Sequence, residues 1–351
     1  MQIGIIGVKF TGKTTLFNVI TAAGLPTGQG GVETHRAVGK VPDPRLDKLT
    51  EMFQPKRKIN ASVEWVDIPG FQGGVGSDGA RESTRFLEHG RKVDALAQVI
   101  RCFDGGYGTP EPMAELETLA LELALADLQV VENRLEKLTK EKARMGKVAN
   151  PLEPPMMERL KEQLENDRPL RDLELNPDEV KMASGYTFLT QKPLIVVLNC
   201  AEGEEAPADV VAAAEKAGAQ VVSLCATMEE ELAELDPEEA AEFLADLGID
   251  EPASGRMIRA SYGALNLQSF FTVGPDECRA WPVRKGATAP VAAGVIHSDL
   301  QRGFIRAEVT AYDDLIQSGS MAQAKAANQV RLEGKAYVVQ DGDILEIRFS
   351  V

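Results

Sequence analysis

A glycine-rich loop near the start of the chain has the composition of a phosphate-binding loop. Residues 7–14 read Gly-Val-Lys-Phe-Thr-Gly-Lys-Thr, fitting G-x-x-x-x-G-K-[ST], between an apolar run and an amphipathic stretch. Gly7 and Gly12 allow a turn that aims main-chain amides at phosphate oxygens, and the following helix adds the positive end of its dipole. Lys13 would neutralise the outer phosphates, and the Thr14 hydroxyl would hold Mg²⁺. The loop predicts a site for ATP or GTP; a glycine-rich connector in an unrelated fold is the alternative.

A second motif strengthens this interpretation. Residues 62–70 form a predicted strand that ends in D-x-x-G, at the distance from the phosphate loop that small GTPases use. Asp67 is placed to reach Mg²⁺ through a water molecule, and the Gly70 N–H to sense a γ-phosphate. An Asp-Ile-Pro-Gly turn after an ordinary strand is the alternative for this segment taken alone.

Two later segments predict the contacts to the base. Residues 194–202 are an apolar strand followed by Asn-Cys-Ala-Glu, where guanine-specific proteins carry N-K-x-D. Because Cys200 replaces the lysine and Glu202 the aspartate, we expect guanine to be selected less strongly and adenine to be accepted as well. Residues 223–226 end the next strand where a second base-contacting loop would lie; a buried strand end is the alternative. The predicted nucleotide contacts are Lys9, Phe10, Thr11, Gly12, Lys13, Thr14, Thr15, Gly70, Asn199, Cys200, Glu202, Cys225 and Ala226, with Thr14 and Asp67 as the metal ligands.

The motifs do not identify a residue that activates water. Phe71 follows D-x-x-G, where Ras-like proteins place a water-orienting glutamine, and a phenyl ring makes no such hydrogen bond. Gln72 and Asp78, in the polar segment that follows, are the candidates for this role. The glycine-rich composition of residues 73–79 is explained more simply by a mobile switch segment than by a catalytic loop.

The elements that must position these residues alternate along the chain. Near-continuous apolar runs are typical of parallel strands covered on both faces, which predicts a doubly wound α/β sheet. Between two of these strands, leucines recur at spacings close to three and four, and Gly146 and Asn150-Pro151 interrupt them, as in an antiparallel helical hairpin. The predicted strands of the sheet are residues 3–6, 63–67, 95–100, 194–198 and 221–224.

The end of the chain changes character. Strands are predicted at residues 269–273, 336–339 and 344–350, with a turn at 340–343, so a small separate α+β domain follows the sheet. We therefore expect a first part of the nucleotide-binding domain at residues 1–111, a helical arm at 112–192, the second part of that domain at 193–267 and a C-terminal domain at 268–351.

Composition limits the classes of function. The chain has 351 residues, a hydrophobic fraction of 44% and a net charge of −16, which argues against proteins that coat DNA or an anionic membrane. It has no run of eighteen apolar residues and no signal-peptide pattern, so we expect a cytoplasmic protein. Four scattered cysteines and three distant histidines do not indicate a zinc site. We expect a monomer.

With these residues laid out, the chain resembles the Obg-like ATPase (YchF) family of TRAFAC GTPases. The likeness rests on residues 41–47, 66–70 and 99–103, the arm, and N-x-x-E at 199–202; the strongest likeness lies in residues 280–343 and covers segments typical of a TGS domain. The resemblance implies a Ras-like G domain of mostly parallel sheet, an inserted helical coiled-coil arm and a ubiquitin-like β-grasp (TGS) domain. It also implies Mg²⁺-dependent hydrolysis of ATP at least as well as GTP, and association with ribosomes.

The chain departs from the family pattern at several positions. Phe10 replaces the asparagine of the usual phosphate loop. In related enzymes that asparagine helps to place a monovalent cation, so its absence argues against activation by potassium. Gly31, or a shifted Thr34, stands where the first switch carries a threonine, and Gln98 replaces a common histidine. These changes concern hydrolysis more than phosphate binding.

Several functions remain open. A slow ATPase or GTPase switch that acts on a ribosomal or RNA partner is the leading hypothesis. A scaffold with little or no hydrolysis, acting through its arm and TGS domain, is the alternative, and a metabolic kinase is a more distant one. Basic residues of the C-terminal domain could contact rRNA phosphates, or could form a solvated face balanced by Asp299, Glu308 and Asp313. These basic residues are Arg279, Arg284, Lys285, Arg302 and Arg306.

Overall fold

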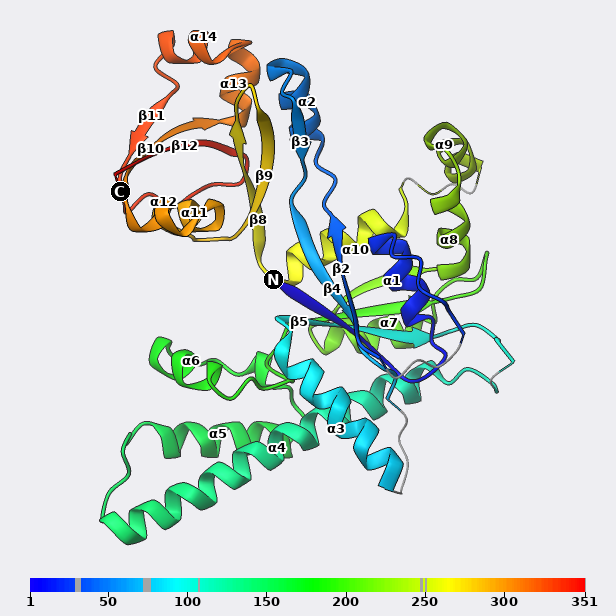
Figure 1. The fold of residues 1–351 in the computed structure, drawn as a ribbon. Helices are drawn as coiled ribbons and strands as arrows, with labels where there is room; N and C mark the ends of the chain where they lie inside the picture. Colours follow the sequence, from blue (N-terminus) through cyan, green and yellow to red (C-terminus); the bar gives the residue numbers. More distant parts are fainter. Residues whose placement is uncertain (29–32, 72–76, 107, 247–248, 250, 351) are drawn as a thin grey trace. The chain divides into compact units, whose positions relative to one another are not determined.

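The computed structural model describes residues 1–28, 33–71, 77–106, 108–246, 249 and 251–350, with only the main chain for residues 77–82 and 237. The chain forms two compact units (Figure 1). The first contains residues 1–37 and 64–260, and the second contains residues 38–63 and 261–351. Among the described residues, no helix is long and apolar enough to cross a membrane.

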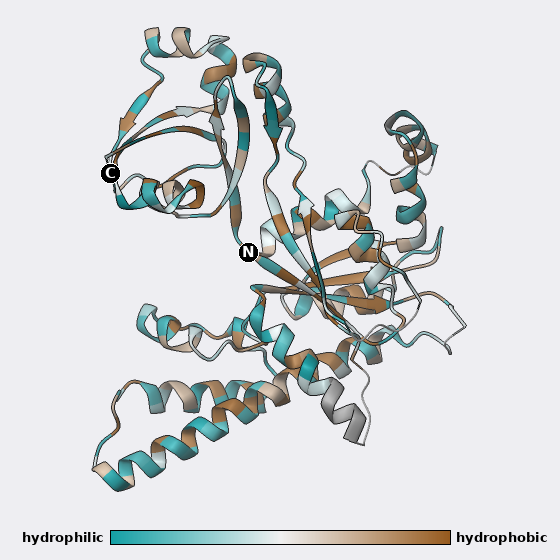
Figure 2. Ribbon diagram, viewed as in Figure 1, coloured by the Kyte–Doolittle hydropathy of each residue, from teal (hydrophilic) through white to brown (hydrophobic). Residues whose placement is uncertain are grey.

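The first unit is built on a six-stranded sheet with the order β2-β4-β1-β5-β6-β7. The pairs β1–β4, β1–β5, β5–β6 and β6–β7 are parallel, as expected of apolar runs covered on both faces. Figure 2 shows its central strands as hydrophobic. All five strands predicted for this sheet are confirmed. The strands are β1 (Gln2–Ile6), β2 (His35–Lys40), β4 (Ser62–Asp67), β5 (Ala95–Arg101), β6 (Leu194–Asn199) and β7 (Gln220–Leu224).

Helices connect these strands. Because the carboxyl ends of parallel strands lie at one edge of a sheet, the loops that follow β1, β4, β6 and β7 bring the sequence motifs together. The helices of this unit outside the arm are α1 (Lys13–Thr21), α3 (Ser77–Lys92), α7 (Ala208–Lys216), α8 (Ala226–Glu234), α9 (Pro237–Asp246) and α10 (Ala253–Ala264), the last of which runs into the second unit.

The predicted helical arm lies between β5 and β6. Its two long helices are α4 (Pro112–Met145) and α5 (Glu153–Glu165), followed by η1 (Leu170–Asp172) and α6 (Pro177–Ser184). Helix α4 starts with proline in its first turn and ends at Gly146, whose φ of 73° makes a left-handed cap. Figure 1 shows the hairpin extending away from the sheet of its own unit.

A buried carboxylate fastens the base of the arm. Asp127 of α4 accepts hydrogen bonds from the amides of Leu189 (3.0 Å) and Thr190 (2.7 Å), just before β6, and pairs with Arg91 at 3.1 Å. Burial raises the pKa of Asp127, and these hydrogen bonds and the Arg91 charge oppose the rise. Asp127 therefore ties the arm to α3 and to the segment that leads back into the sheet at β6.

The second unit is a β-grasp domain. Its six-stranded sheet has the order β11-β10-β12-β8-β9-β3, with an antiparallel β8–β9 hairpin and β12 parallel to β8. Its elements are α2 (Pro44–Phe53), β3 (Arg57–Ile59), β8 (Leu267–Val273), β9 (Glu277–Arg284), α11 (Ala289–Ile296), α12 (Ser298–Arg302), β10 (Phe304–Ala311), α13 (Tyr312–Ser318), α14 (Met321–Ala326), β11 (Arg331–Glu333) and β12 (Asp343–Phe349).

One predicted strand of this domain was wrong. Residues 336–339 form no strand, and Val338 makes only an isolated bridge to Thr288. The segment is held by single bonds instead, because the Val339 amide donates to Ala287 and the Ala289 amide to Tyr337. The strands predicted at 269–273 and 344–350 are confirmed as β8 and β12, apart from Ser350, which lies beyond the end of β12.

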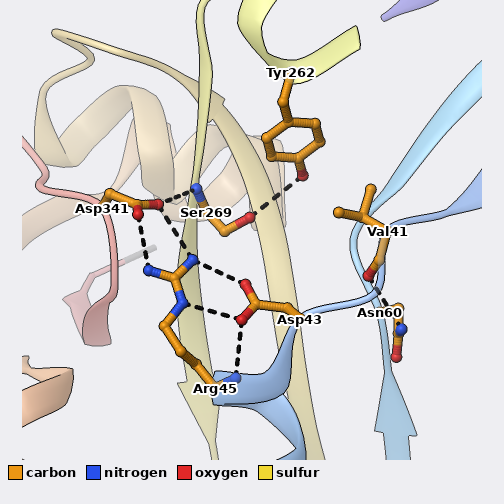
Figure 3. Close-up of polar contacts among 7 residues, drawn as sticks. All are labelled: Val41, Asp43, Arg45, Asn60, Tyr262, Ser269 and Asp341. Carbon is orange, nitrogen blue, oxygen red and sulfur yellow. Dashed lines mark hydrogen bonds and ion pairs between the residues drawn. The ribbon is translucent and has the colours of Figure 1, made fainter. Parts of the chain in front are cut away.

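The segment 38–63 packs with the C-terminal part of the chain. Strand β3 adds to the edge of the second sheet, parallel to β9. The Arg45 guanidinium lies between two carboxylates, with Nη2 2.9 Å from Asp43 and Nη1 2.8 Å from Asp341 (Figure 3). Asp341 in turn accepts from the Ser269 amide at 2.9 Å. The domain boundaries expected from the sequence stay a prediction, and this packing of residues 38–63 was not foreseen.

Candidate nucleotide-binding site

The loop between β1 and α1 has a conformation that requires glycine. Gly7 has φ of 148° and Gly12 has φ of 91°, a region that side chains rarely adopt. A Cβ atom on Gly12 would collide with the Asn199 side-chain nitrogen, and one on Gly7 with the Val99 carbonyl oxygen. The two glycines therefore let the loop curl tightly against the ends of β5 and β6.

The amides of this loop have no partner within the described chain. None of the hydrogen bonds found among the described residues uses the main-chain amides of residues 11–15 as a donor. Residues 13–15 are the first turn of α1, and that turn holds no acidic side chain. Unpaired amides at the positive end of a helix dipole form an anion-binding site. The arrangement suits the oxygens of a phosphate group.

Lys13 lies inside this loop. Its Nζ donates to the Val8 carbonyl oxygen at 2.5 Å, and Gly70 is so close that a Cβ there would lie 2.9 Å from Nζ. Burial lowers the pKa of Lys13 to about 8, although the charges of Asp67 and Glu115 act against this shift. An ammonium group that has lost its water gains most from a bound anion.

Thr14 and Asp67 meet at the other side of the loop. The Thr14 hydroxyl donates to Oδ2 of Asp67 at 2.8 Å. Burial raises the pKa of Asp67, and the Thr14 hydrogen bond and the Lys13 charge oppose the rise. Magnesium in phosphate sites is commonly held by one or two protein oxygens together with substrate oxygens and water. One hydroxyl and one carboxylate beside the anion-binding amides fit that requirement.

A cavity of about 570 Å³ opens at this loop. Thr11 lies behind its lining, buried, with its hydroxyl on the Val8 carbonyl at 3.2 Å. All the other residues that were predicted to contact the phosphates or the metal do line the cavity. The lining consists of Lys9, Phe10, Gly12, Lys13, Thr14, Thr15, Pro26, Thr27, Gly28, Glu33, His35, Asp67, Ile68, Pro69, Gly70 and Phe103.

Sequence reasoning missed Glu33, His35 and Phe103 among these residues. Glu33 precedes the second strand and His35 is the first residue of that strand, in the region where a first switch is expected, and that position was the available signal. Thr34, named as a shifted switch hydroxyl, bonds His89 Nε2 at 3.3 Å and is not part of the lining. Gly31 lies outside the described residues.

Asn199 ties the base-side loop to the phosphate loop. Its Nδ2 donates to the Thr11 carbonyl at 3.0 Å, and its Oδ1 accepts from the Ala226 amide at 3.0 Å. Both ends of this buried amide are thus used within the chain, so Asn199 holds the two loops in register. Oδ1 keeps a second lone pair and Nδ2 a second proton for a ligand.

Three of the other predicted base contacts lie at a second cavity of about 860 Å³, which Ala226 does not line. Cys200, Glu202 and Cys225 line it, together with side chains of α10 that the sequence did not suggest. One of these, Arg256, has a buried Nε without a hydrogen-bond partner among the described residues. The cavity is lined by Cys200, Ala201, Glu202, Gly203, Glu204, Glu205, Ser223, Leu224, Cys225, Met228, Ile249, Glu251, Arg256 and Arg259.

Phe71 points into the hydrophobic core and does not line the phosphate cavity. Its side chain is 4% exposed, its ring lies 5.6 Å from that of Phe86, and its amide donates to the Gly7 carbonyl at 3.0 Å. Gln72 lies outside the described residues, and Asp78 belongs to α3 with its side chain outside the description. Gln98 donates to the Glu115 carbonyl at 3.2 Å.

The basic residues expected to meet RNA in the C-terminal unit are partly engaged. Arg302 pairs with Asp299, and the Arg279 guanidinium stacks 3.7 Å above the Trp281 ring. Glu308 is held by Lys325 and by Arg348. Contact of the five predicted basic residues with rRNA stays a prediction, and so does the balanced, solvated face that the sequence left as the alternative.

The chain is similar to known proteins both over its C-terminal residues and over nearly its whole length. Residues 267–350 match the YchF-GTPase C-terminal family, described as "Protein of unknown function (DUF933)". The chain is 44% identical to the ribosome-binding ATPase YchF of Pasteurella multocida and 41% identical to that of Bacillus subtilis, with 99% of each chain covered. The solved structure of the Schizosaccharomyces pombe YchF GTPase superposes with a TM-score of 0.85 at 30% identity, covering 99% of this chain and 97% of that one.

Proposed function

This chain belongs to the Obg-like ATPase (YchF) family, and from that premise we propose that it is a slow, Mg²⁺-dependent ATP or GTP hydrolase that acts as a ribosome-associated switch. The observation that carries the proposal is the set of unpaired amides at residues 11–15, with Lys13 and the Thr14–Asp67 pair around one cavity.

Phosphate binding rests on the chain's own groups. The amides of residues 11–15 donate to phosphate oxygens, and the Lys13 ammonium leaves the Val8 carbonyl to neutralise the outer phosphates. Gly70 lies against Nζ, so its segment is placed to respond when that lysine moves. Thr14 and Asp67 would hold Mg²⁺, which when bound offsets the negative charge that develops on the phosphate oxygens.

Slow hydrolysis follows from the groups that face the cavity. Phe71 is in the core, so the position that carries glutamine in Ras-like proteins orients no water here. We assign the alignment of water to the polar side chains of the cavity wall, of which His35 and Glu33 are the described candidates. Gln72 and Asp78 remain candidates as well.

The choice of base is proposed to favour adenine at least as much as guanine. Asn199 sets the position of the loop, and Glu202 offers a carboxylate without the stacking lysine that guanine-specific proteins have at the position of Cys200. Calorimetry with ADP and with GDP tests this directly. A preference for GDP greater than about tenfold, roughly 1.4 kcal/mol, would show that the role of Glu202 is misassigned.

The partner is inferred from the relatives, which are named ribosome-binding ATPases. We propose that the arm (112–192) and the TGS domain (268–351) carry this contact, and that the protein works as a monomer in the cytoplasm. Single-turnover hydrolysis of ATP and GTP, measured with and without ribosomes, tests the switch. The proposal expects slow turnover whose rate changes when ribosomes are added. No hydrolysis in either condition would favour a nucleotide-binding scaffold instead. The buried Phe71 is the structural argument for that alternative.

A further inference from the structure

The far end of the arm carries a concentration of positive charge. Residues 137–147, the last turns of α4 and the start of the connection to α5, contain five basic residues and one acidic residue in a chain with a net charge of −16. The preceding part of α4, residues 112–136, contains six acidic residues and one basic residue. The five basic residues are Lys137, Lys140, Lys142, Arg144 and Lys147.

These five side chains are exposed and largely without counter-charge. Lys140 pairs with Glu136 at 2.5 Å, whereas Lys142, Arg144 and Lys147 make no ion pair with any described residue. The single acid, Glu141, accepts from the Ala149 amide at 2.8 Å and so braces the connection between the helices. The positive charge of this segment therefore faces solvent.

Stabilisation of the helix accounts for only part of the cluster. Lys142 and Arg144 lie in the last turn of α4, where cations interact favourably with the negative end of the helix dipole. Lys137 and Lys140 precede that turn, and Lys147 follows the cap at Gly146. Lys140 also supports the helix through its i, i+4 ion pair with Glu136, so Lys137 and Lys147 are the two basic residues left without such a role.

The cluster has a regular geometry on a rigid support. Lys137, Lys140 and Arg144 have the spacing i, i+3 and i+7, which places them on one face of α4 over about 10 Å of its axis. The opposite face is fixed by Leu138, which packs in the arm's own hydrophobic core. Positively charged side chains at regular spacing on a rigid helix can each contact a phosphate group of a nucleic-acid backbone.

We propose that residues 137–147 dock on the phosphate backbone of RNA. This rests on the proposed ribosome association and names the part of the chain that makes the contact. An anionic membrane is the less suitable partner, because the segment has no aromatic side chain, Leu138 is buried, and Met145 alone among its large apolar residues is exposed. The arm end binds RNA through charge alone, without reading its sequence.

The test compares two charge-matched triple variants of the full-length protein. One is K137Q/K140Q/R144Q, and the control is R168Q/K181Q/K216Q, which removes three exposed positive charges of the same unit outside residues 137–147. Binding is measured to salt-washed bacterial 70S ribosomes and to a short RNA duplex at several salt concentrations. ADP affinity and thermal unfolding report that both variants fold and keep the nucleotide site.

The proposal expects the arm variant to lose about tenfold or more in affinity for both probes, with a salt dependence reduced by about two to three counterions. The control variant should lose much less. Equal losses in the two variants, or no loss, would overturn the proposal while leaving ribosome binding by the wild type intact.

The two proposals can fail separately. A wild-type protein that binds nucleotide but not ribosomes contradicts the proposed partner; the RNA proposal then stands only if duplex binding depends on residues 137–147, and otherwise falls. Arm-dependent binding to vesicles containing phosphatidylglycerol that is tighter than binding to the duplex would assign the surface to a membrane instead.

Discussion

The Thr14 hydroxyl donates a 2.8 Å hydrogen bond to Oδ2 of Asp67, and so joins the first turn of α1 to the end of β4 across 53 positions of sequence. The two residues belong to separate sequence motifs, and the parallel pairing of β1 with β4 brings them together. Because the carboxylate is buried and its hydrogen-bond partner is a neutral hydroxyl, the pair would gain from a bound cation such as the Mg²⁺ that we propose for this site.

Replacing Asp67 by Asn should separate metal binding from phosphate binding. The amide keeps the shape of the side chain and removes its charge, so ATP affinity should fall by about tenfold or more when Mg²⁺ is present. Little change is expected in EDTA, where the amides of residues 11–15 still act. Calorimetry in the two conditions measures this, and an equal loss in both would contradict the role of Asp67 as a metal ligand.

The Asn199→Ala variant tests the connection between the two loops. It removes both hydrogen bonds of a buried amide and leaves the Thr11 carbonyl and the Ala226 amide without partners. We expect the free energy of unfolding to fall by about 2 to 4 kcal/mol, with weaker nucleotide binding as a consequence. The Asn199→Asp variant keeps the acceptor for the Ala226 amide, so its free energy of unfolding, measured by urea titration, should lie between those of the wild type and the alanine variant. Wild-type stability in the alanine variant would show that the loops are held by other contacts.

Substituting Phe71 by Gln should not create a Ras-like catalyst. The side chain at this position is directed into the core beside Phe86, so the glutamine amide would be buried without a partner. The expected result is a loss of about 2 to 4 kcal/mol in stability with no increase in the single-turnover rate. Phe71→Leu, which remains apolar, is the control for packing. A faster rate in the glutamine variant would show that the segment turns outward when nucleotide binds.

Nucleotide binding should weaken as the solution becomes alkaline. Burial lowers the pKa of Lys13 to about 8 in the empty site, so the ammonium group increasingly loses its proton between pH 7 and pH 9. Lys13 must then take up a proton again when a phosphate group binds. Affinity for ADP should fall over this range, and calorimetry in buffers of different ionisation enthalpy should record proton uptake at pH 8.5. Because folding lowers this pKa from 10.5, the same group makes the empty protein more stable as the pH rises from about 8 towards 10.5. An affinity that does not change with pH would contradict the role of Lys13.

Much of this site was predictable because it depends on local sequence. Gly7, Gly12 and Lys13 act through the conformation of one short loop, and the apolar runs before the loop and before Asp67 indicated the parallel strands that position them. His35, the first residue of β2, and Phe103, which follows β5, were missed because neither residue belongs to a phosphate-binding or base-binding motif, and the folded path of the chain alone brings them to the cavity.

Long-range packing explains the other differences. The attachment of residues 38–63 to the C-terminal unit depends on Arg45 meeting Asp341, far away in sequence, and on three residues of β3 joining a sheet edge. Neither signal is local. The role of Asn199 as a tether was also hidden, because a motif gives the residue type and not the partners of its two amide ends.

The most direct measurement is the affinity of the Lys13→Ala variant for ADP and ATP by isothermal titration calorimetry, beside the wild type and the exposed-lysine control Lys216→Ala. If the loop and its lysine hold the phosphates, Lys13→Ala loses about 100-fold or more in affinity while remaining folded, and the control binds as the wild type does. Unchanged affinity in Lys13→Ala would contradict the assignment of this loop as the nucleotide site.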